Sequence, residues 1–272
     1  MKKNLSTIVL CFVFFIGLSL LLYPTISDYW NSIYQSKAII NYTEQVADLN
    51  QGDYQRLLEE ARDYNAQLAE QTWTFALSDA EKEIYKKMLN LGDGTPMAWI
   101  EIPVIDVSLP IYHSTDDEVL QVAVGHIEGT SLPVGGNNTH CVLSGHRGLP
   151  SAKLLSNLDR MVEGDIFTIQ TLDETLTYEV DQIRIVLPED VDDINLVKGK
   201  DYCTLVTCTP YGINSHRLLV RGQRIENQDL FDSIRVPADA FQIEPVIVAP
   251  FVAVPILLLL FAWLLIHYRK RK

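Results

Sequence analysis

The sequence predicts a mostly β domain, a closed or nearly closed barrel, with an apolar segment at each end of the chain. Several short stretches between residues 99 and 225 are rich in β-branched and apolar residues and are separated by turn residues, which is typical of a barrel with few helices. Residues 5–23 and 246–266 are almost wholly apolar, and runs of this length can cross a bilayer. We therefore expect a folded domain over residues 96–228, flanked by two transmembrane helices.

The first apolar run is expected to be an uncleaved membrane anchor. Two lysines precede it, as they would in a signal peptide, but Tyr23 and Pro24 stand where a cleavage site needs small residues. This favours an anchor over a cleaved signal peptide. Residues 1–4 are then a short cytoplasmic N-terminus.

Basic residues mark the outer end of both apolar runs. Lys2 and Lys3 precede the first run, and residues 267–272 follow the second with four basic residues and no acid. By the positive-inside rule, both termini lie in the cytoplasm and the domain between the spans lies on the extracellular face of the membrane. We expect residues 229–245 to be a juxtamembrane linker and residues 267–272 to be a basic cytoplasmic tail.

The charge of the chain argues against a nucleic-acid partner. The 272 residues carry a formal net charge of −13, and part of the positive charge is concentrated at the two termini. The region between the apolar runs is therefore more acidic than the whole chain. Such a surface repels phosphate backbones.

Residues 24–95 are expected to form an extracellular helical segment. Apolar residues recur at roughly helical spacing from Ser36 to Leu77, with a break near Gly52. Ser78 is placed to cap a further helix that reaches Leu89, because an acidic residue follows it at the capping-box position. The segment is either a simple stalk or a part that packs on the barrel.

The predicted strands are short, and the longest of them changes its alternation midway. Its apolar residues share one parity from 176 to 180 and the other parity from 183 to 187, which predicts a bulge near Asp181-Gln182. The strands are predicted at Trp99–Ile102, Val107–Tyr112, His140–Leu143, Ile166–Gln170, Leu176–Leu187, Tyr202–Cys208 and Arg217–Ile225.

The strand that begins at Tyr202 ends on a cysteine. Pro210 cannot continue a strand ladder, so pairing should stop just after Cys208. A rigid scaffold can aim a thiol at a strand end toward a bound substrate. From this strand alone, a buried core cysteine remains the alternative interpretation.

Three further features carry a family resemblance. Residues 204–208 read TLVTC, residues 144–148 read SGHRG, and Arg217 opens the next strand. Together they resemble the sortases, which are cysteine transpeptidases of Gram-positive cell surfaces. The resemblance extends from about Trp99 to Ile225.

Longer strings resemble the class C sortases, which assemble pili. They are LPIYH at residues 109–113, GHIEGTSLP at residues 125–133 and TCTPYGIN at residues 207–214. The resemblance implies a sortase-type eight-stranded β-barrel with N-terminal helices and short connecting helices. The second transmembrane helix also resembles class C.

The resemblance assigns the catalytic residues. It implies that Cys208 is the nucleophile, His146 the general acid and base, and Arg217 the group that stabilises the oxyanion or the substrate. His216 and Arg221 are the rival candidates. Because neighbours on a strand point to opposite faces, His216 should face away from the site if Arg217 faces it.

The resemblance also implies a reaction and its partners. The thiolate of Cys208 cleaves an LPxTG-like sorting signal, and a lysine of another pilin subunit resolves the acyl-enzyme by forming an isopeptide bond. No metal or organic cofactor is required. The alternatives are a sortase that anchors surface proteins to the peptidoglycan precursor and a non-catalytic membrane-tethered scaffold, against which the intact set of three residues argues.

In class C sortases a lid with an Asp-Pro-aromatic motif lies over the active cysteine. This chain has Trp73 and Phe75 in that neighbourhood but no Asp-Pro pair. Trp73 is the candidate for the aromatic residue of a lid. We expect the lid to close less firmly than one with the full motif.

For the remaining residues of interest we expect structural roles and no part in catalysis. Arg147, beside His146, is expected at the surface or in a weak salt bridge. Cys141 and Cys203 each lie five residues before a candidate catalytic residue, so the two thiols become neighbours if their strands pair in parallel. We favour two free buried thiols over a disulfide bridge.

Overall fold

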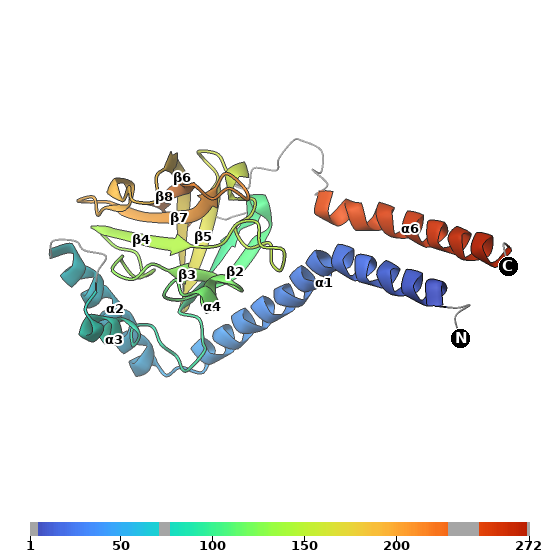
Figure 1. The fold of residues 1–272 in the computed structure, drawn as a ribbon. Coiled ribbons are helices and arrows are strands. Elements are labelled where there is room, and N and C mark those ends of the chain that lie inside the picture. Colours follow the sequence, from blue (N-terminus) through green and yellow to red (C-terminus); the bar gives the residue numbers. More distant parts are fainter. Residues whose placement is uncertain (1–4, 71–76, 228–244, 271–272) are drawn as a thin grey trace. The chain divides into compact units, whose positions relative to one another are not determined.

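The computed structural model describes residues 5–70, 77–227 and 245–270 (Figure 1). The chain divides into two compact units, of which one comprises residues 1–31, 150–152 and 238–272 and the other comprises residues 32–149 and 153–237. Helix α1, Leu5–Ala47, contributes residues to both units.

The first unit contains the start of α1 and helix α6, Pro245–Lys270. The rings of Phe14 and Phe261 stack with their centroids 4.1 Å apart. Within the described residues, α1 is the one helix that is long and apolar enough to cross a membrane, and the apolar part described for α6, Ala253–Leu264, is shorter. The second transmembrane helix therefore stays a prediction.

Helix α1 is longer than its sequence pattern indicates. It continues through Pro24 as far as Ala47, whereas helical spacing becomes visible only from Ser36. A proline inside a helix removes one backbone hydrogen bond, and the apolar residues before it surround the whole helix instead of forming a stripe. The spacing of apolar residues therefore reveals only the part of α1 that packs on the barrel.

Two shorter helices follow. Helix α2, Gln51–Glu70, begins after Asn50, whose side chain accepts a hydrogen bond from the backbone N–H of Asp53 at 2.9 Å. The interruption between the two helices therefore lies slightly before Gly52. Helix α3, Asp79–Tyr85, has the predicted capping box of Ser78 and Glu81. It ends before Leu89, which has a positive φ of 52° that an α-helix does not allow.

Eight strands form a closed barrel in the order β1-β2-β3-β4-β7-β8-β6-β5. This confirms the predicted fold class. The strands are β1 Ala98–Ile102, β2 Val107–His113, β3 Val124–His126, β4 Thr139–Ser144, β5 Ile166–Thr171, β6 Glu174–Val186, β7 Asp201–Thr209 and β8 His216–Ile225. A helical turn, α4 Asp117–Leu120, and three 3₁₀ turns, η2 Pro103–Ile105, η3 Leu158–Arg160 and η4 Asp192–Ile194, connect them.

Strand β3 was not predicted, because three residues are too short to show an alternating pattern. The bulge in β6 is confirmed: its pairing with β8 shifts between Val180 and Gln182. The extra residue, Asp181, is therefore placed on the outside of the ladder, where it meets a charged partner described below.

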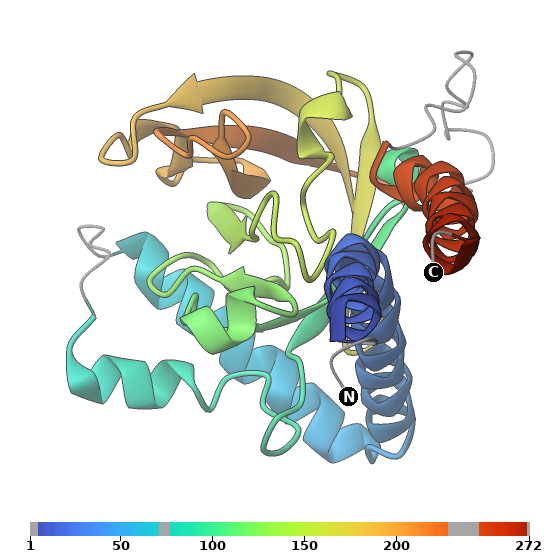
Figure 2. The ribbon, with the colours of Figure 1, turned by 45° about the vertical axis from the view of Figure 1, so that its right-hand side comes forward.

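The helical segment packs on the barrel and is not a free stalk (Figures 1 and 2). On α2, Leu57, Leu58 and Ala61 are buried. Asn65 exchanges two hydrogen bonds with the backbone of Leu132, at 3.0 and 2.7 Å. On α1, the hydroxyl of Tyr42 donates to the carbonyl of Met97 at 3.0 Å and accepts from the backbone N–H of Leu172 at 2.6 Å.

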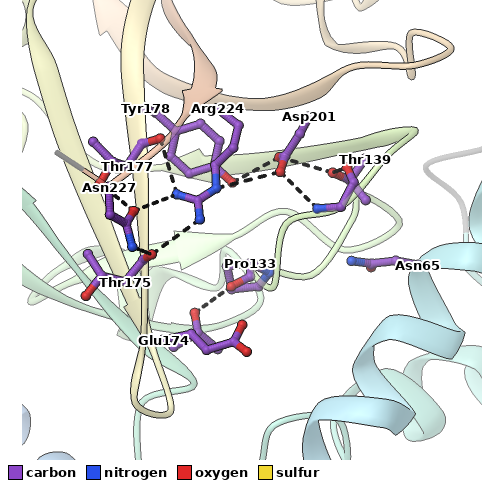
Figure 3. Close-up of polar contacts among 12 residues, drawn as sticks. Asn65, Pro133, Thr139, Glu174, Thr175, Thr177, Tyr178, Asp201, Arg224 and Asn227 are labelled. Atoms are coloured by element: carbon purple, nitrogen blue, oxygen red, sulfur yellow. Dashed lines mark hydrogen bonds and ion pairs between the residues drawn. The ribbon is translucent and has the colours of Figure 1, made fainter.

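A polar network surrounds Asp201 (Figure 3). The carboxylate of Asp201, at the start of β7, accepts hydrogen bonds from the N–H of Gly136 at 2.9 Å, the hydroxyl of Tyr178 at 3.1 Å and the hydroxyl of Thr139 at 3.2 Å. Burial raises the pKa of Asp201, and these donors oppose the rise. A cavity of about 470 Å³ lies beside the network.

This network is remote from the predicted catalytic cysteine. Asp201 and Cys208 lie at opposite ends of β7, and seven residues of strand span about 23 Å. The candidate site is therefore at the other end of the barrel.

Candidate active site

The parallel pairing of β4 with β7 brings His146 level with Cys208. The last register pair is Ser144 with Val206. The ladder continues one residue further, because the N–H of Gly145 donates to the carbonyl of Val206 at 3.1 Å and the hydroxyl of Thr207 donates to the carbonyl of Gly145 at 2.8 Å. If the same register continues, the next pair is His146 with Cys208.

The antiparallel pairing of β7 with β8 places Arg217 directly opposite Cys208. Directly opposed residues present their side chains on the same face of a sheet. Both side chains, like that of His146, are half-buried. The Arg217 guanidinium donates to the backbone carbonyls of Asn214 at 3.3 Å and His216 at 3.2 Å, which directs it along the end of β8.

The face that carries Cys208 and Arg217 also carries an apolar floor. Val206 lies two residues before Cys208, and Leu219 lies two residues after Arg217. Both belong to a buried cluster with Val142 of β4 and Ile194 of the connection between β6 and β7. This cluster gives Cys208 and Arg217 a rigid, packed support.

Three of the other histidines are committed to structural hydrogen bonds. His113 donates from Nε2 to the carbonyl of Met88 at 2.7 Å. His140 lies between the carbonyl of Asn195 at 2.9 Å and the hydroxyl of Thr204 at 2.7 Å. Burial lowers the pKa of both His113 and His140 to about 4, so both are neutral near pH 7.

His126 is held from both ring nitrogens. Its Nε2 faces the carbonyl of Ser131 at 2.9 Å, so this nitrogen carries the proton and Nδ1 accepts from the hydroxyl of Tyr85, also at 2.9 Å. By contrast, the ring of His146 makes no hydrogen bond to any residue in the described part of the chain. The imidazole of His146 is therefore available to a substrate.

The two rival candidates are placed elsewhere. His216 pairs with Thr209, one position from Cys208 and Arg217, and so faces the other side of the sheet as expected. Arg221 shares the face of Arg217 but makes two hydrogen bonds of 2.9 Å to Asp181, the bulged residue of β6. Its guanidinium also lies over the ring of Tyr202, 4.2 Å from the centroid.

Arg147 forms a salt bridge, which was one of the two expected alternatives, but its side chain is more buried than a surface position implies. Its side chain is 9% exposed and forms an ion pair of 2.5 Å with Asp159. No sequence signal marks this burial, because it depends on η3 folding back over the loop after β4.

The expectation for the two inner thiols is confirmed, since Cys141 and Cys203 are register partners and are both free and buried.

Trp73, the lid candidate, lies outside the described residues.

Known proteins resemble this chain in sequence and in fold. A family model for the sortase domain matches residues 100–225. The structure of sortase C1 from Streptococcus agalactiae is 48% identical, with a TM-score of 0.69, and the match covers 71% of this chain and all of that chain. The chain belongs to the sortase family.

A further solved structure supports class C within this family, whereas a curated relative carries the name of another sortase. Sortase C of Streptococcus pneumoniae is 43% identical with a TM-score of 0.64, and the match covers 70% of this chain and 97% of that structure. Sortase D of Bacillus subtilis is 31% identical over 129 residues, which are 46% of this chain and 62% of that protein. The chain thus matches less than two thirds of the length of this curated sortase.

Proposed function

We propose that this sortase is a pilus-assembling transpeptidase of class C. It would cleave an LPxTG-like sorting signal and join pilin subunits through an isopeptide bond to a lysine. The single observation that carries the proposal is the strand register that aligns Cys208 with His146 and Arg217. The similarity to sortase C of Streptococcus pneumoniae, whose structure is described as informing pilin substrate specificity, supports the choice of substrate.

In the proposed reaction, the Cys208 thiolate attacks the carbonyl carbon between the threonine and glycine of the signal. Arg217 offers several planar donors that stay charged, and it stabilises the oxyanion that forms. His146, as imidazolium, protonates the leaving glycine amine, which leaves a thioester on Cys208. A lysine amine then attacks the thioester, and the new amide bond releases the thiol.

The proposed location is the cell membrane, with the catalytic domain on the extracellular face and both termini in the cytoplasm. One apolar helix, α1, is long enough to span the bilayer, which supports an anchor. The basic tail that follows the second apolar run supports a second span in α6 with the same orientation as the first.

The deciding experiment replaces the nucleophile and offers two acceptors. The full chain in detergent micelles is incubated with a pilin that carries both a sorting signal and an acceptor lysine, and separately with the pilin and a glycine nucleophile. High-mass pilin ladders from the wild-type protein support the proposal. Cys208→Ala should abolish them while costing about 1 kcal/mol of stability or less. Ladders from a folded Cys208→Ala protein would refute the assignment.

A second function is favoured by one feature of the sequence. No Asp-Pro pair precedes Trp73 or Phe75, so the lid motif of class C is incomplete. A sortase that anchors surface proteins would use the same three residues with an amine of the peptidoglycan precursor. Product formed with the glycine nucleophile, without pilin ladders, would select this function.

A further inference from the structure

Arg147 and Thr209 directly follow the residues that we propose as catalytic. Along β7, Cys208 and Thr209 face opposite sides of the sheet. Arg147 lies in the loop after β4. The guanidinium of Arg147 reaches the hydroxyl of Thr209 through Nη1 at 3.5 Å. Thr209 is itself buried, with 7% of its surface exposed. A contact next to the two catalytic positions thus links the two segments that carry them.

The same guanidinium contacts two further segments. Its Nη2 donates to Asp159 of η3 at 2.5 Å, and its carbon lies 5.9 Å from the ring centroid of Tyr211 in the loop after β7. Tyr211 in turn lies against Gly148, where a side-chain Cβ would come within 2.9 Å of the ring. The His146 loop is therefore held on η3 and on the loop that follows Cys208.

The loop after β7 connects this contact to the third proposed catalytic residue. The N–H groups of Ile213 and Asn214 both donate to the carbonyl of Pro210 at 3.0 Å, which makes the loop a compact turn. The carbonyl of Asn214 then accepts a hydrogen bond from Arg217. One short loop thus contacts Arg147 near its beginning and Arg217 at its end.

Stability alone does not account for an arginine at this position. Burying a guanidinium costs free energy that a single ion pair repays only partly. Asp159, its partner, is 47% exposed, and within the described part of the chain the buried Nε of Arg147 has no hydrogen-bond partner. Removing Arg147 leaves Asp159 in contact with water, so the domain should still fold.

We propose that Arg147 is a positioning residue. It holds His146 in register with Cys208 by linking the loop after β4 to the end of β7. The proposal rests on the proposed function of these two residues. This positioning role requires the planar guanidinium with its several donors, and not only its positive charge, because the group contacts three partners at once. A lysine, with a single ammonium group, cannot contact Asp159, Thr209 and Tyr211 together.

The test compares Arg147→Lys, Arg147→Met and a control in the full chain in detergent micelles. Arg221→Met is the matched control, because Arg221 is also a partly buried arginine paired with an aspartate. The substrate is a peptide with an LPxTG-like signal and a glycine nucleophile. We expect both Arg147 variants to lower kcat at least tenfold with KM changed less than twofold, and the control to lower kcat less than threefold.

A second readout separates positioning from stability and from charge. The rate of alkylation of Cys208 by iodoacetamide is measured against pH, because the thiolate is the reactive form and its formation responds to nearby charge. Arg147→Lys keeps the charge, so a shifted midpoint in this variant reports a displaced His146. Wild-type kcat and an unshifted midpoint in Arg147→Lys would overturn the proposal, as would an equal loss in Arg221→Met.

Failure of the proposed function would look different. In that case the wild-type protein would form no product, or Cys208→Ala would retain activity. The alkylation profile of the Arg147 variants would still decide whether Arg147 positions His146, since it needs no turnover.

Discussion

At the scale of single residues, strand register selects among chemically similar side chains. Cys208 opposes Arg217, whereas Thr209 opposes His216. A shift of one residue would place Cys208 opposite His216 or Leu218 instead and turn the thiol to the other face. The alternation of a strand therefore distinguishes Arg217 from its neighbour His216, although the two are adjacent in sequence.

We predict that His146→Ala and Arg217→Ala each lower turnover roughly a hundredfold or more, because they remove the proton donor and the oxyanion stabiliser. His216→Ala and His113→Ala should leave the chemical step unchanged, since the former faces away and the latter is bonded to the backbone of Met88. The measurement is the rate of acyl-enzyme formation on Cys208. A folded His216→Ala protein that loses this step, beside an active His146→Ala, would reverse the assignment.

At the scale of elements, α1 is attached to the barrel by a buried hydroxyl. Tyr42 is 1% exposed, and its hydroxyl serves both Met97 before β1 and Leu172 between β5 and β6. The hydroxyl therefore joins the helix to two separate parts of the barrel.

We predict that Tyr42→Phe lowers the free energy of unfolding by about 1–3 kcal/mol, because the N–H of Leu172 and the carbonyl of Met97 lose their buried partner. Thr43→Ala is the control. Its exposed hydroxyl donates to the carbonyl of Ile39 in its own helix, so we expect a change within about 0.5 kcal/mol. Urea unfolding measures both variants, and equal effects would show that the hydroxyl of Tyr42 does not attach the helix.

The lid is a second question at this scale. The sequence has no acidic residue between Gln71 and Ser78 that could pair with the active-site arginine. The closed state should therefore lack a charge-assisted hydrogen bond, and a loss of about 1.4 kcal/mol already changes a population tenfold. We predict that Trp73→Ala raises the rate of iodoacetamide labelling of Cys208 by less than tenfold.

A point substitution is the appropriate test of the lid, because α1 and α2 bury side chains that a deletion would remove from the core. A hundredfold increase in labelling in Trp73→Ala would mean that the lid is firmly closed and would contradict the prediction.

At the scale of the whole molecule, the buried His140 and the half-buried His113 link stability to pH. Burial lowers the pKa of His113 and His140 to about 4, below the value of about 6.5 in an unfolded chain. The unfolded state therefore binds more protons between these two values. Their contribution to stability is complete above about pH 6.5 and is lost as the pH falls toward 4, by up to about 3 kcal/mol for each.

We predict that the free energy of unfolding falls between pH 6.5 and pH 4.5. The raised pKa values of Asp201 and Glu101 have the opposite sign and reduce the fall near pH 4. His140→Gln should show a smaller fall than the wild-type protein in urea unfolding at several pH values, because glutamine does not titrate. The same fall in both proteins would show that His140 does not titrate on unfolding.

The sequence by itself determined the features that depend on local pattern. Seven of the barrel strands, the bulge at Asp181 and the cap at Ser78 each leave a signature of alternation or of a few neighbouring residues. The three candidate catalytic residues were identified through short strings that resemble a family. In each case the information lies within a few residues, so folding was not needed to read it.

Only the tertiary structure decided the features that depend on partners distant in sequence. Strand β3 exists because β2 and β4 pair with it, and its three residues show no pattern of their own. Arg147 is buried because Asp159, Thr209 and Tyr211 converge on it. An arginine in a loop is most stable in water unless other segments bring partners to it, and sequence near Arg147 does not report where those segments fold.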